Sequence, residues 1–201
     1  MTSPVDIHTH RSPRPGDLFS AGLHPWDSAD VNPAELSDID RSLRRSDVIA
    51  IGEVGLDALR GAPLEHQELL LEHFIDLSEE LRKPLIIHCV RAWDRLLRIY
   101  RRRRPTQPWA IHGFRGRPEL ARQLLDVGMY LSLGRRYNPA TAAIIPSDRL
   151  LIETDDDPAA DIDALAASLP AYDPATTLRF LGLDRSSTLG AVVNLKAANQ
   201  E

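Results

Sequence analysis

The chain has 201 residues, of which 43% are hydrophobic and 26% are charged, a composition typical of a globular protein with a substantial core. Its formal net charge of −5 argues against a protein that coats nucleic acid through non-specific charge attraction. No apolar run reaches the length of a membrane span, the first ten residues do not resemble a signal peptide, and the single cysteine, Cys89, excludes an internal disulfide. We therefore expect one cytoplasmic domain over residues 1–201, with no membrane partner and no obligate protein partner.

Short apolar segments predict strands, and longer segments with helical periodicity separate them. The predicted strands are residues 5–10, 18–24, 48–55, 84–89, 109–114, 129–134 and 149–155. They are almost continuously hydrophobic, as expected for parallel strands that are covered on both faces. Helices are predicted to begin at Asn32-Pro33, at Pro63 and near Pro118, and the last of these to end at Gly128. Alternating strands and helices predict an α/β fold with a parallel sheet.

Polar residues that can carry chemistry stand at or near the ends of these strands. In the segment "VDIHTH", His8 and His10 are two residues apart and share one face of an extended backbone. The later residues in such positions are His24, Glu53, His88, His112 and Asp155. A TIM-type (β/α) barrel gathers the carboxyl ends of its strands at one mouth, so we expect these side chains to meet there.

Taken singly, each of these residues has an ordinary explanation as a hydrogen-bonded strand end or a helix cap. Together, four of these five histidines, the glutamate and the aspartate make a set of six. They would crowd imidazoles and repelling carboxylates into one pocket, a conflict that divalent cations remove. Six ligands are too many for one tetrahedral catalytic ion but are typical of two ions that share a carboxylate. Glu53 is the only glutamate among the six and is therefore the candidate bridge. Imidazole and carboxylate ligands suit zinc or manganese, and oxygen-rich sets favour magnesium.

The motifs also resemble a known family. The segments "DIHTH", "GLHPW", "AIGEVGLD", "KPLIIHC" followed by Arg91-Ala92, "WAIHGFRG" and "DRLLIETD" are similar, in this order, to those of the TatD-related metal-dependent hydrolases of the amidohydrolase superfamily. The resemblance covers residues from about 5 to about 158. It implies a TIM-type barrel, two divalent metal ions (Mg, Mn or Zn) and hydrolysis of phosphodiesters, with DNA exonuclease activity as the expected chemistry.

The resemblance also assigns ligands by position. His8, His10 and Asp155 would hold one ion, His88 and His112 the other, and Glu53 would bridge them. Of these, Glu53 and Asp155 are the candidate catalytic residues, with Asp155 placed to orient the attacking water or to accept its proton.

Four further residues are candidates for supporting roles. His24 and Arg91 are the candidates for contacting a substrate phosphate. Asp6 and Asp57 are candidates for supporting the ligating imidazoles from the second layer of contacts.

The chain departs from the family pattern in two places. Only residues 11–17 separate His10 from Leu18, where longer relatives have a helix, a strand and a second helix. This connection is too short for a helical crossover between parallel strands. We therefore predict a shortened barrel of seven strands that lacks one β/α unit. The segment after Asp155 is acidic and helical in pattern, and it lacks the loop that longer relatives place beside the substrate.

Three functions remain open from the sequence. The first is a phosphodiesterase or deoxyribonuclease that acts on DNA or on a small phosphoester. The second is a hydrolase of a small amide, lactone or phosphate monoester that uses the same two ions. The third is a non-catalytic barrel that has lost its activity. The complete ligand set favours an enzyme, because a binding module has no need of a bridging carboxylate.

Overall fold

The computed structural model describes residues 3–10, 18–183 and 194–197. Its strands are β1 Asp6–Thr9, β2 Phe19–Ala21, β3 Val48–Asp57, β4 Leu85–Val90, β5 Trp109–Ile111, β6 Tyr130–Leu133, β7 Leu150–Ile152 and β8 Asn194–Ala197. Its helices are η1 Pro25–Ala29 (a 3₁₀-helix), α1 Pro33–Leu43, α2 Leu64–Leu81, α3 Trp93–Arg103, α4 Pro118–Asp126, α5 Pro139–Ala142, α6 Ile162–Ser168 and α7 Pro174–Phe180. The strands predicted from the sequence are all present as β1 to β7, with ends that differ by a few residues.

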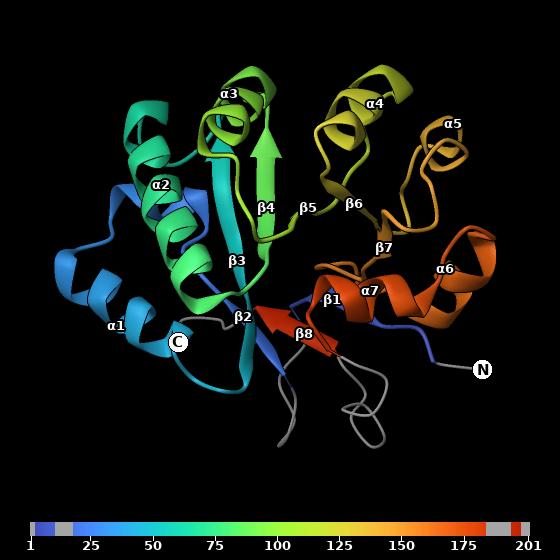
Figure 1. Ribbon diagram of the computed structural model, residues 1–201, viewed down its shortest axis with the longest axis horizontal. Coiled ribbons are helices and arrows are strands. Elements are labelled where there is room, and N and C mark those ends of the chain that lie inside the picture. Colours follow the sequence, from blue (N-terminus) through green and yellow to red (C-terminus); the bar gives the residue numbers. More distant parts are fainter. Residues whose placement is uncertain (1–2, 11–17, 184–193, 198–201) are drawn as a thin grey trace.

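The strands form one parallel, curled sheet, which makes the fold α/β and a partial TIM-type barrel. Strands β2 to β7 lie side by side in chain order, and β8 and β1 extend the sheet beyond β2. Figure 1 shows helices α1 to α4 along the outside of the curled sheet, with α5, α6 and α7 beside β6 and β7. All pairings between neighbouring strands are parallel, so their carboxyl ends share one edge.

The number of strands differs from the predicted seven, because β8 adds an eighth. This strand pairs with β1 on one side and with β2 on the other, so a segment from the end of the chain separates two strands that are neighbours in sequence. Sequence periodicity reports local structure only, and a pairing between segments this far apart has no local pattern. The connection 11–17, on which the prediction of a missing β/α unit depended, lies outside the described residues.

The two edges of the sheet approach each other at the carboxyl ends of the strands. Thr9, the last residue of β1, pairs in parallel with Asp155, which follows β7. The Asp155 N–H donates to the carbonyl of His8 (3.0 Å), and the His10 N–H donates to the carbonyl of Asp155 (3.2 Å). These backbone bonds bring the first and seventh strands together where the polar strand ends lie.

Local signals explain where the outer helices begin. Asn32 caps α1, its side chain accepting from the N–H groups of Ala34 and Glu35 while the Glu35 carboxylate accepts from the Asn32 N–H. This reciprocal capping box satisfies backbone donors that a helix leaves free at its start. Helix α4 begins at Pro118, whose fixed φ suits the first helical position. The chain then turns at Gly128, whose φ of +99° suits a residue without a Cβ.

Two apolar layers support the sheet. The larger packs the sheet against the outer helices and includes Leu71 and Phe74 of α2. The smaller contains side chains from several strands, among them Ile7, Ile86 and Leu151, together with Phe180 of α7. Because these strand residues come from opposite sides of the curled sheet, the smaller layer fills the barrel interior beneath the carboxyl ends of the strands.

Candidate metal centre

The residues predicted as ligands lie together at the carboxyl ends of the strands. His8 lies in β1 and His10 directly follows it, Glu53 lies in β3, His88 in β4, His112 directly after β5, and Asp155 after β7. The local geometry follows from strand periodicity, since His88 and His112 stand two residues beyond the interior residues Ile86 and Ala110. Residues two apart share a face, so the interior-facing register carries these imidazoles into the mouth.

Glu53 stands at the centre of this group, with its side chain only 5% exposed. Its Oε1 lies 2.8 Å from His8 Nε2 and 3.2 Å from His10 Nε2. Its Oε2 lies 2.7 Å from His112 Nε2 and 3.5 Å from His88 Nδ1. His24 Nε2 is also 3.5 Å from Oε2, so each carboxylate oxygen faces a different set of histidines, as a carboxylate shared by two cations requires.

Asp155 completes the β1 side of the centre. Its Oδ1 lies 3.8 Å from His8 Nε2 and 3.6 Å from His10 Nε2, and the two imidazole Nε2 atoms are 3.2 Å apart. The φ of Asp155 is +53°, in the left-handed region that aspartate tolerates better than most residues. The backbone bonds to β1 hold this conformation and turn the carboxylate toward the two histidines.

A buried carboxylate orients His88. The Nε2 of His88 lies 3.2 Å from Asp57 Oδ2, which can only accept a hydrogen bond when ionised. Nε2 therefore donates, and in the neutral ring Nδ1 keeps a free lone pair that faces Glu53 and His112. This carboxylate–histidine pair is the contact that fixes the tautomer of many metal-ligating histidines, so Asp57 lies where the sequence predicted it.

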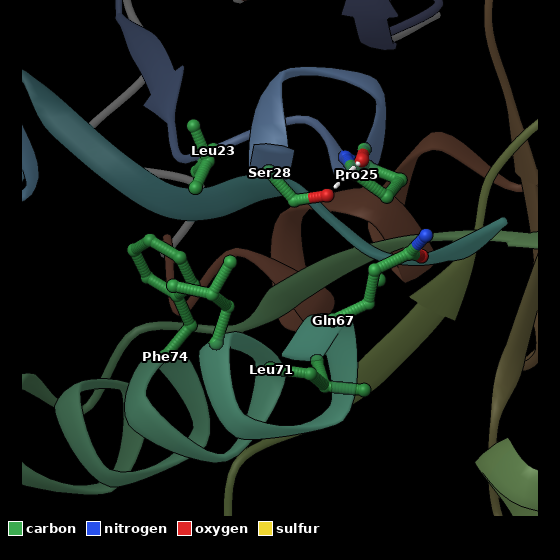
Figure 2. Close-up of a pocket in the computed structure, with 8 residues that line it drawn as sticks. Leu23, Pro25, Ser28, Gln67, Leu71 and Phe74 are labelled. Carbon is green, nitrogen blue, oxygen red and sulfur yellow. Dashed lines mark hydrogen bonds between the residues drawn. The ribbon is translucent and has the colours of Figure 1, made fainter. Parts of the chain in front are cut away.

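Asp57 is itself held by Gln67 of α2. The Gln67 side chain accepts from the Asp57 N–H (2.7 Å) and donates to the Asp57 carbonyl (3.0 Å). Figure 2 shows Gln67 on α2 beside the segment that contains Pro25 and Ser28, where it lines a cavity of about 10 Å³. A cavity of this size holds at most a single water molecule, so the layer behind Asp57 is closely packed.

Glu153 is a residue that the sequence analysis missed. It is completely buried, its Oε1 lies 3.5 Å from His112 Nδ1, and the same oxygen accepts from the Gly113 N–H (2.5 Å). Glu153 therefore lies behind His112 as Asp57 lies behind His88, but it leaves Nδ1 of His112 without a hydrogen bond in the described structure, while Nε2 of His112 is directed at Glu53. The sequence contained a signal, because Glu153 stands two residues before Asp155 and shares its face on an extended chain.

His24 lies beside the candidate ligands His88 and Glu53, nearer than a residue that only contacts a substrate phosphate needs to be. Its Nε2 is 3.3 Å from His88 Nδ1 and 3.5 Å from Glu53 Oε2. Its Nδ1 caps η1 by accepting from the Trp26 N–H (3.2 Å), so the neutral ring carries its proton on Nε2. While that bond stands, His24 offers the centre a hydrogen-bond donor and no free lone pair.

Asp6 has a different position from the one expected. Its carboxylate accepts from the Thr154 hydroxyl (2.6 Å), the Thr154 N–H (3.0 Å) and the His8 N–H (3.3 Å). It thus joins the backbones of β1 and the segment after β7, and in the described structure it makes no hydrogen bond to the imidazole of a candidate ligand. Burial raises the pKa of Asp6 to about 6, although its hydrogen bonds with Thr154 oppose that change.

Charges of opposite sign balance inside the centre. Burial alone would raise the pKa of Glu53, but the neighbouring His112 and His8 and its hydrogen bonds hold that pKa well below its usual range. Burial alone would lower the pKa of His112, but Glu53 and Glu153 raise it well above the ordinary value. The side chains therefore favour ionised carboxylates that need positive charge beside them.

The donor set fits divalent cations. Three groups of imidazole and carboxylate atoms each lie within 4.8 Å of one another: His8, His10, Glu53 and Asp155; His24, Glu53 and His88; and His112, Glu153 and Asp155. Glu53 and Asp155 each belong to two of these groups, as expected where neighbouring ions share ligands. Neutral imidazole nitrogen and carboxylate oxygen are ligands for zinc and manganese, and the carboxylates also suit magnesium.

A pocket of about 510 Å³ opens over the β4 and β5 side of the centre. Its lining includes His88, His112, Asp155 and three exposed arginines, Arg91, Arg115 and Arg136. Arg91 therefore lies at the mouth, as the sequence predicted for a phosphate contact. Within the described part of the chain, none of the three arginines forms an ion pair within 4.0 Å, although Arg136 lies near enough to Asp157 to help lower the pKa of that carboxyl.

A curled parallel sheet with imidazoles and carboxylates at the carboxyl ends of its strands is the arrangement of the metal-dependent barrel hydrolases. The sequence profile of the family described as TatD related DNase matches residues 8–177. The chain therefore belongs to the TatD-related DNase family, and this confirms the resemblance seen in its motifs.

Individual relatives agree with this assignment. The chain is 33% identical over 146 residues to a 3'-5' ssDNA/RNA exonuclease TatD of Edwardsiella piscicida, covering 68% of this chain and 56% of the relative. It is 34% identical over 148 residues to the uncharacterized metal-dependent hydrolase YcfH of Escherichia coli K12, covering 69% and 55%. The chain thus spans about half the length of the curated relatives it matches.

Solved structures support the fold. The TatD homologue YjjV of Escherichia coli matches with a TM-score of 0.65 at 25% identity, covering 81% of this chain and 68% of that one. A TatD family hydrolase of Entamoeba histolytica matches with a TM-score of 0.61 at 23% identity, covering 69% and 50%. In the described ranges, no helix combines the length and the apolar character needed to cross a lipid bilayer.

Proposed function

We propose that residues 1–201 act as a single metal-dependent hydrolase domain that cleaves phosphodiester bonds at an end of single-stranded nucleic acid. The observation that carries this proposal is the position of Glu53, whose two carboxylate oxygens face separate sets of histidines. The name of the Edwardsiella piscicida relative, a single-strand exonuclease, supports the choice of substrate. The barrel is proposed to be a shortened one that lacks a β/α unit between β1 and β2.

The proposed ligands divide between two sides of Glu53. His8, His10 and Asp155 would hold one divalent cation, His88 and His112 would hold the other, and Glu53 would bridge them. Magnesium, manganese or zinc, once bound, would lower the pKa of an attacking water and neutralise the charge that builds on phosphate oxygens.

The chain's own residues would supply the remaining steps. Asp155, with a side chain 20% exposed at the edge of the centre, is placed to orient the attacking water or to accept its proton. His24 would donate from Nε2 to a phosphate oxygen, because its Nδ1 is engaged by Trp26. Arg91, Arg115 and Arg136 would hold the phosphate at the mouth by charge-assisted hydrogen bonds.

The distribution of charge favours the end of a strand over a long duplex. The chain carries a net charge of −5, so its surface as a whole repels a polyanion. The mouth is an exception close to the centre, because three arginines line it against two aspartates, Asp155 and Asp156. A substrate that places one phosphate there and leaves most of its length in solvent meets the least repulsion.

The test measures metal content and hydrolysis together. Elemental analysis of the protein after exposure to manganese should give close to two ions per chain, and a 5'-labelled single-stranded oligonucleotide should be shortened from its 3' end. A chelator should stop the reaction, and manganese should restore it. His66→Ala is the matched control, because His66 is an exposed histidine of α2 away from the centre.

Two results would contradict the proposal. The first is a protein that takes up no metal under any condition, which would favour a non-catalytic barrel. The second is metal-dependent cleavage of a lactone, amide or phosphate monoester in a substrate panel that leaves nucleotide diesters intact.

A further inference from the structure

A second hollow adjoins the mouth pocket, between α3 and α4 and beside the start of α2. Its volume is about 550 Å³, and the residues that matter here are Leu64, Arg91, Trp93, Arg98, Leu120 and Gln123. We call this hollow the α3 groove. Arg91 and Trp93 line both the α3 groove and the mouth pocket, so the two hollows meet at these side chains. Figure 1 shows α3 and α4 as neighbours on the outside of β4 and β5.

The α3 groove carries a net positive charge, because three arginines (Arg91, Arg95 and Arg98) line it and Asp94 is the one acidic residue in its lining. Arg98 is exposed and, among the described residues, makes no ion pair or side-chain hydrogen bond. Arg95 also lines the groove, but it pairs with Glu65 (2.8 Å) and Glu68 (3.0 Å) on the side of α2. Arg98 and Arg91 therefore remain available for a ligand, one inside the groove and one at its junction with the mouth.

Trp93 adds an aromatic surface at this junction. The side chain is half-buried, and its ring meets Phe114 edge to face, with ring centroids 6.0 Å apart. That contact holds the indole in place while part of it stays exposed to both hollows. A partly exposed indole that is held in place by an edge-to-face contact suits stacking with a nucleobase. Such stacking needs a base that is not paired.

We propose that the α3 groove binds the nucleotides next to the scissile end of a single strand. This rests on the proposed function of the metal centre and names the path of its substrate: Arg91 at the junction, a base on Trp93, and the following phosphate on Arg98. The groove thereby distinguishes a strand of several nucleotides from a mononucleotide ester, which fills the mouth alone.

The experiment compares two arginines of α3 that differ in position only. Arg98 and Arg101 are both exposed and both lack an ion-pair partner among the described residues, but Arg101 lies outside the groove. Arg98→Ala should lower kcat/KM for a single-stranded hexanucleotide about tenfold, as expected for the loss of one charged contact. It should leave kcat/KM for the mononucleotide ester thymidine 5'-(p-nitrophenyl phosphate) within about twofold. Arg101→Ala should change neither value.

A binding measurement gives a second readout that needs no turnover. The probe is a fluorescent hexanucleotide with phosphorothioate linkages, whose anisotropy is followed in manganese at several salt concentrations. Arg98→Ala should reduce the slope of log K against log salt by about 0.7, the value for one phosphate contact on a single strand. Arg101→Ala should leave the slope unchanged, and thermal melting should confirm that both variants are folded.

The outcomes separate this proposal from the function of the metal centre. Equal losses for Arg98→Ala and Arg101→Ala, or no loss for Arg98→Ala on the hexanucleotide, would overturn the groove while leaving the hydrolase intact. A protein that hydrolyses neither substrate, yet binds the hexanucleotide through Arg98, would overturn the proposed function and leave the groove in place. Wild-type protein that does not bind the hexanucleotide would overturn the groove.

Discussion

The two sides of the candidate centre hold their histidines by different means. On the β4 and β5 side, buried carboxylates face the far nitrogens of the rings: Asp57 is hydrogen-bonded to His88 Nε2, whereas Glu153 lies 3.5 Å from His112 Nδ1, which makes no hydrogen bond in the described structure. On the β1 side, the far nitrogen of His8 is buried and has no hydrogen-bond partner in the described structure. That side is held through the backbone instead, by Asp6 and by the bonds between β1 and Asp155.

This difference bears on how strongly each side should bind a cation. A ring whose tautomer and orientation are set in advance loses little freedom on coordination, and the Asp57–His88 hydrogen bond sets one ring of the β4 and β5 side in this way. On the β1 side, backbone position brings two imidazoles together, but no carboxylate is hydrogen-bonded to the far nitrogen of the His8 ring in the described structure. We therefore expect the first equivalent of metal to bind on the β4 and β5 side, and the second, more weakly, on the β1 side.

The largest effect should come from removing the residue that both sides share. In Glu53→Ala, both sides lose a ligand, and the imidazoles lose the carboxylate that balances their charge. Metal content should fall from two ions to near zero, and metal-dependent turnover should fall by at least about 10³-fold. Glu53→Gln keeps the shape and serves as a control for packing. Turnover that survives in Glu53→Ala would remove the two-ion assignment.

A smaller effect should distinguish the two sides from each other. His8→Ala removes a ligand from the β1 side, and His88→Ala removes one from the β4 and β5 side. Each should lower turnover about 10²-fold. Isothermal titration should, however, show that only His8→Ala keeps a tight single site. If both variants keep one site of equal affinity, the two sides are equivalent and the comparison fails.

Much of the centre follows from local sequence. Strand ends and period-two spacing place His8 and His10 on one face, and the same rule places His88 and His112 beyond interior residues. These predictions succeed because each depends on a few neighbouring residues and on the shared direction of parallel strands. The strands and the helix start at Asn32 follow in the same way.

The features that the sequence did not predict depend on which strands lie close together in the fold. Glu153 faces His112 across two strands that are not neighbours in the sheet, and only the curl of the sheet brings them together. Asp6 joins β1 to Thr154 for the same reason. The insertion of β8 between β1 and β2 is likewise a long-range pairing. No periodic pattern in the sequence indicates these long-range contacts between strands.

The carboxylates behind the histidines allow a finer test of the comparison. Asp57→Asn and Glu153→Gln should each weaken the first metal-binding step about 10-fold to 100-fold, since they support ligands on the β4 and β5 side. The second step should change less. Asp40→Asn is the matched control, because Asp40 contacts His73 at 2.8 Å in a carboxylate–histidine pair outside the centre. An equal effect on both steps would mean that these carboxylates act through overall charge.

The smallest effect should come from loosening β1 without touching a ligand. The Tyr172 hydroxyl accepts from the Val5 N–H (2.9 Å) and donates to the Val5 carbonyl (3.4 Å), which ties the residue before β1 to the segment before α7. Tyr172→Phe should lower the free energy of unfolding by about 1 kcal/mol, measured by urea denaturation. It should also weaken only the second metal-binding step, by less than about threefold, because β1 positions its histidines through the backbone. Tyr137→Phe is the control, since its hydroxyl makes a 3.5 Å contact with Ser168 at the surface. A change in the first metal-binding step of Tyr172→Phe would show that the two sides are coupled through the sheet and are not held independently.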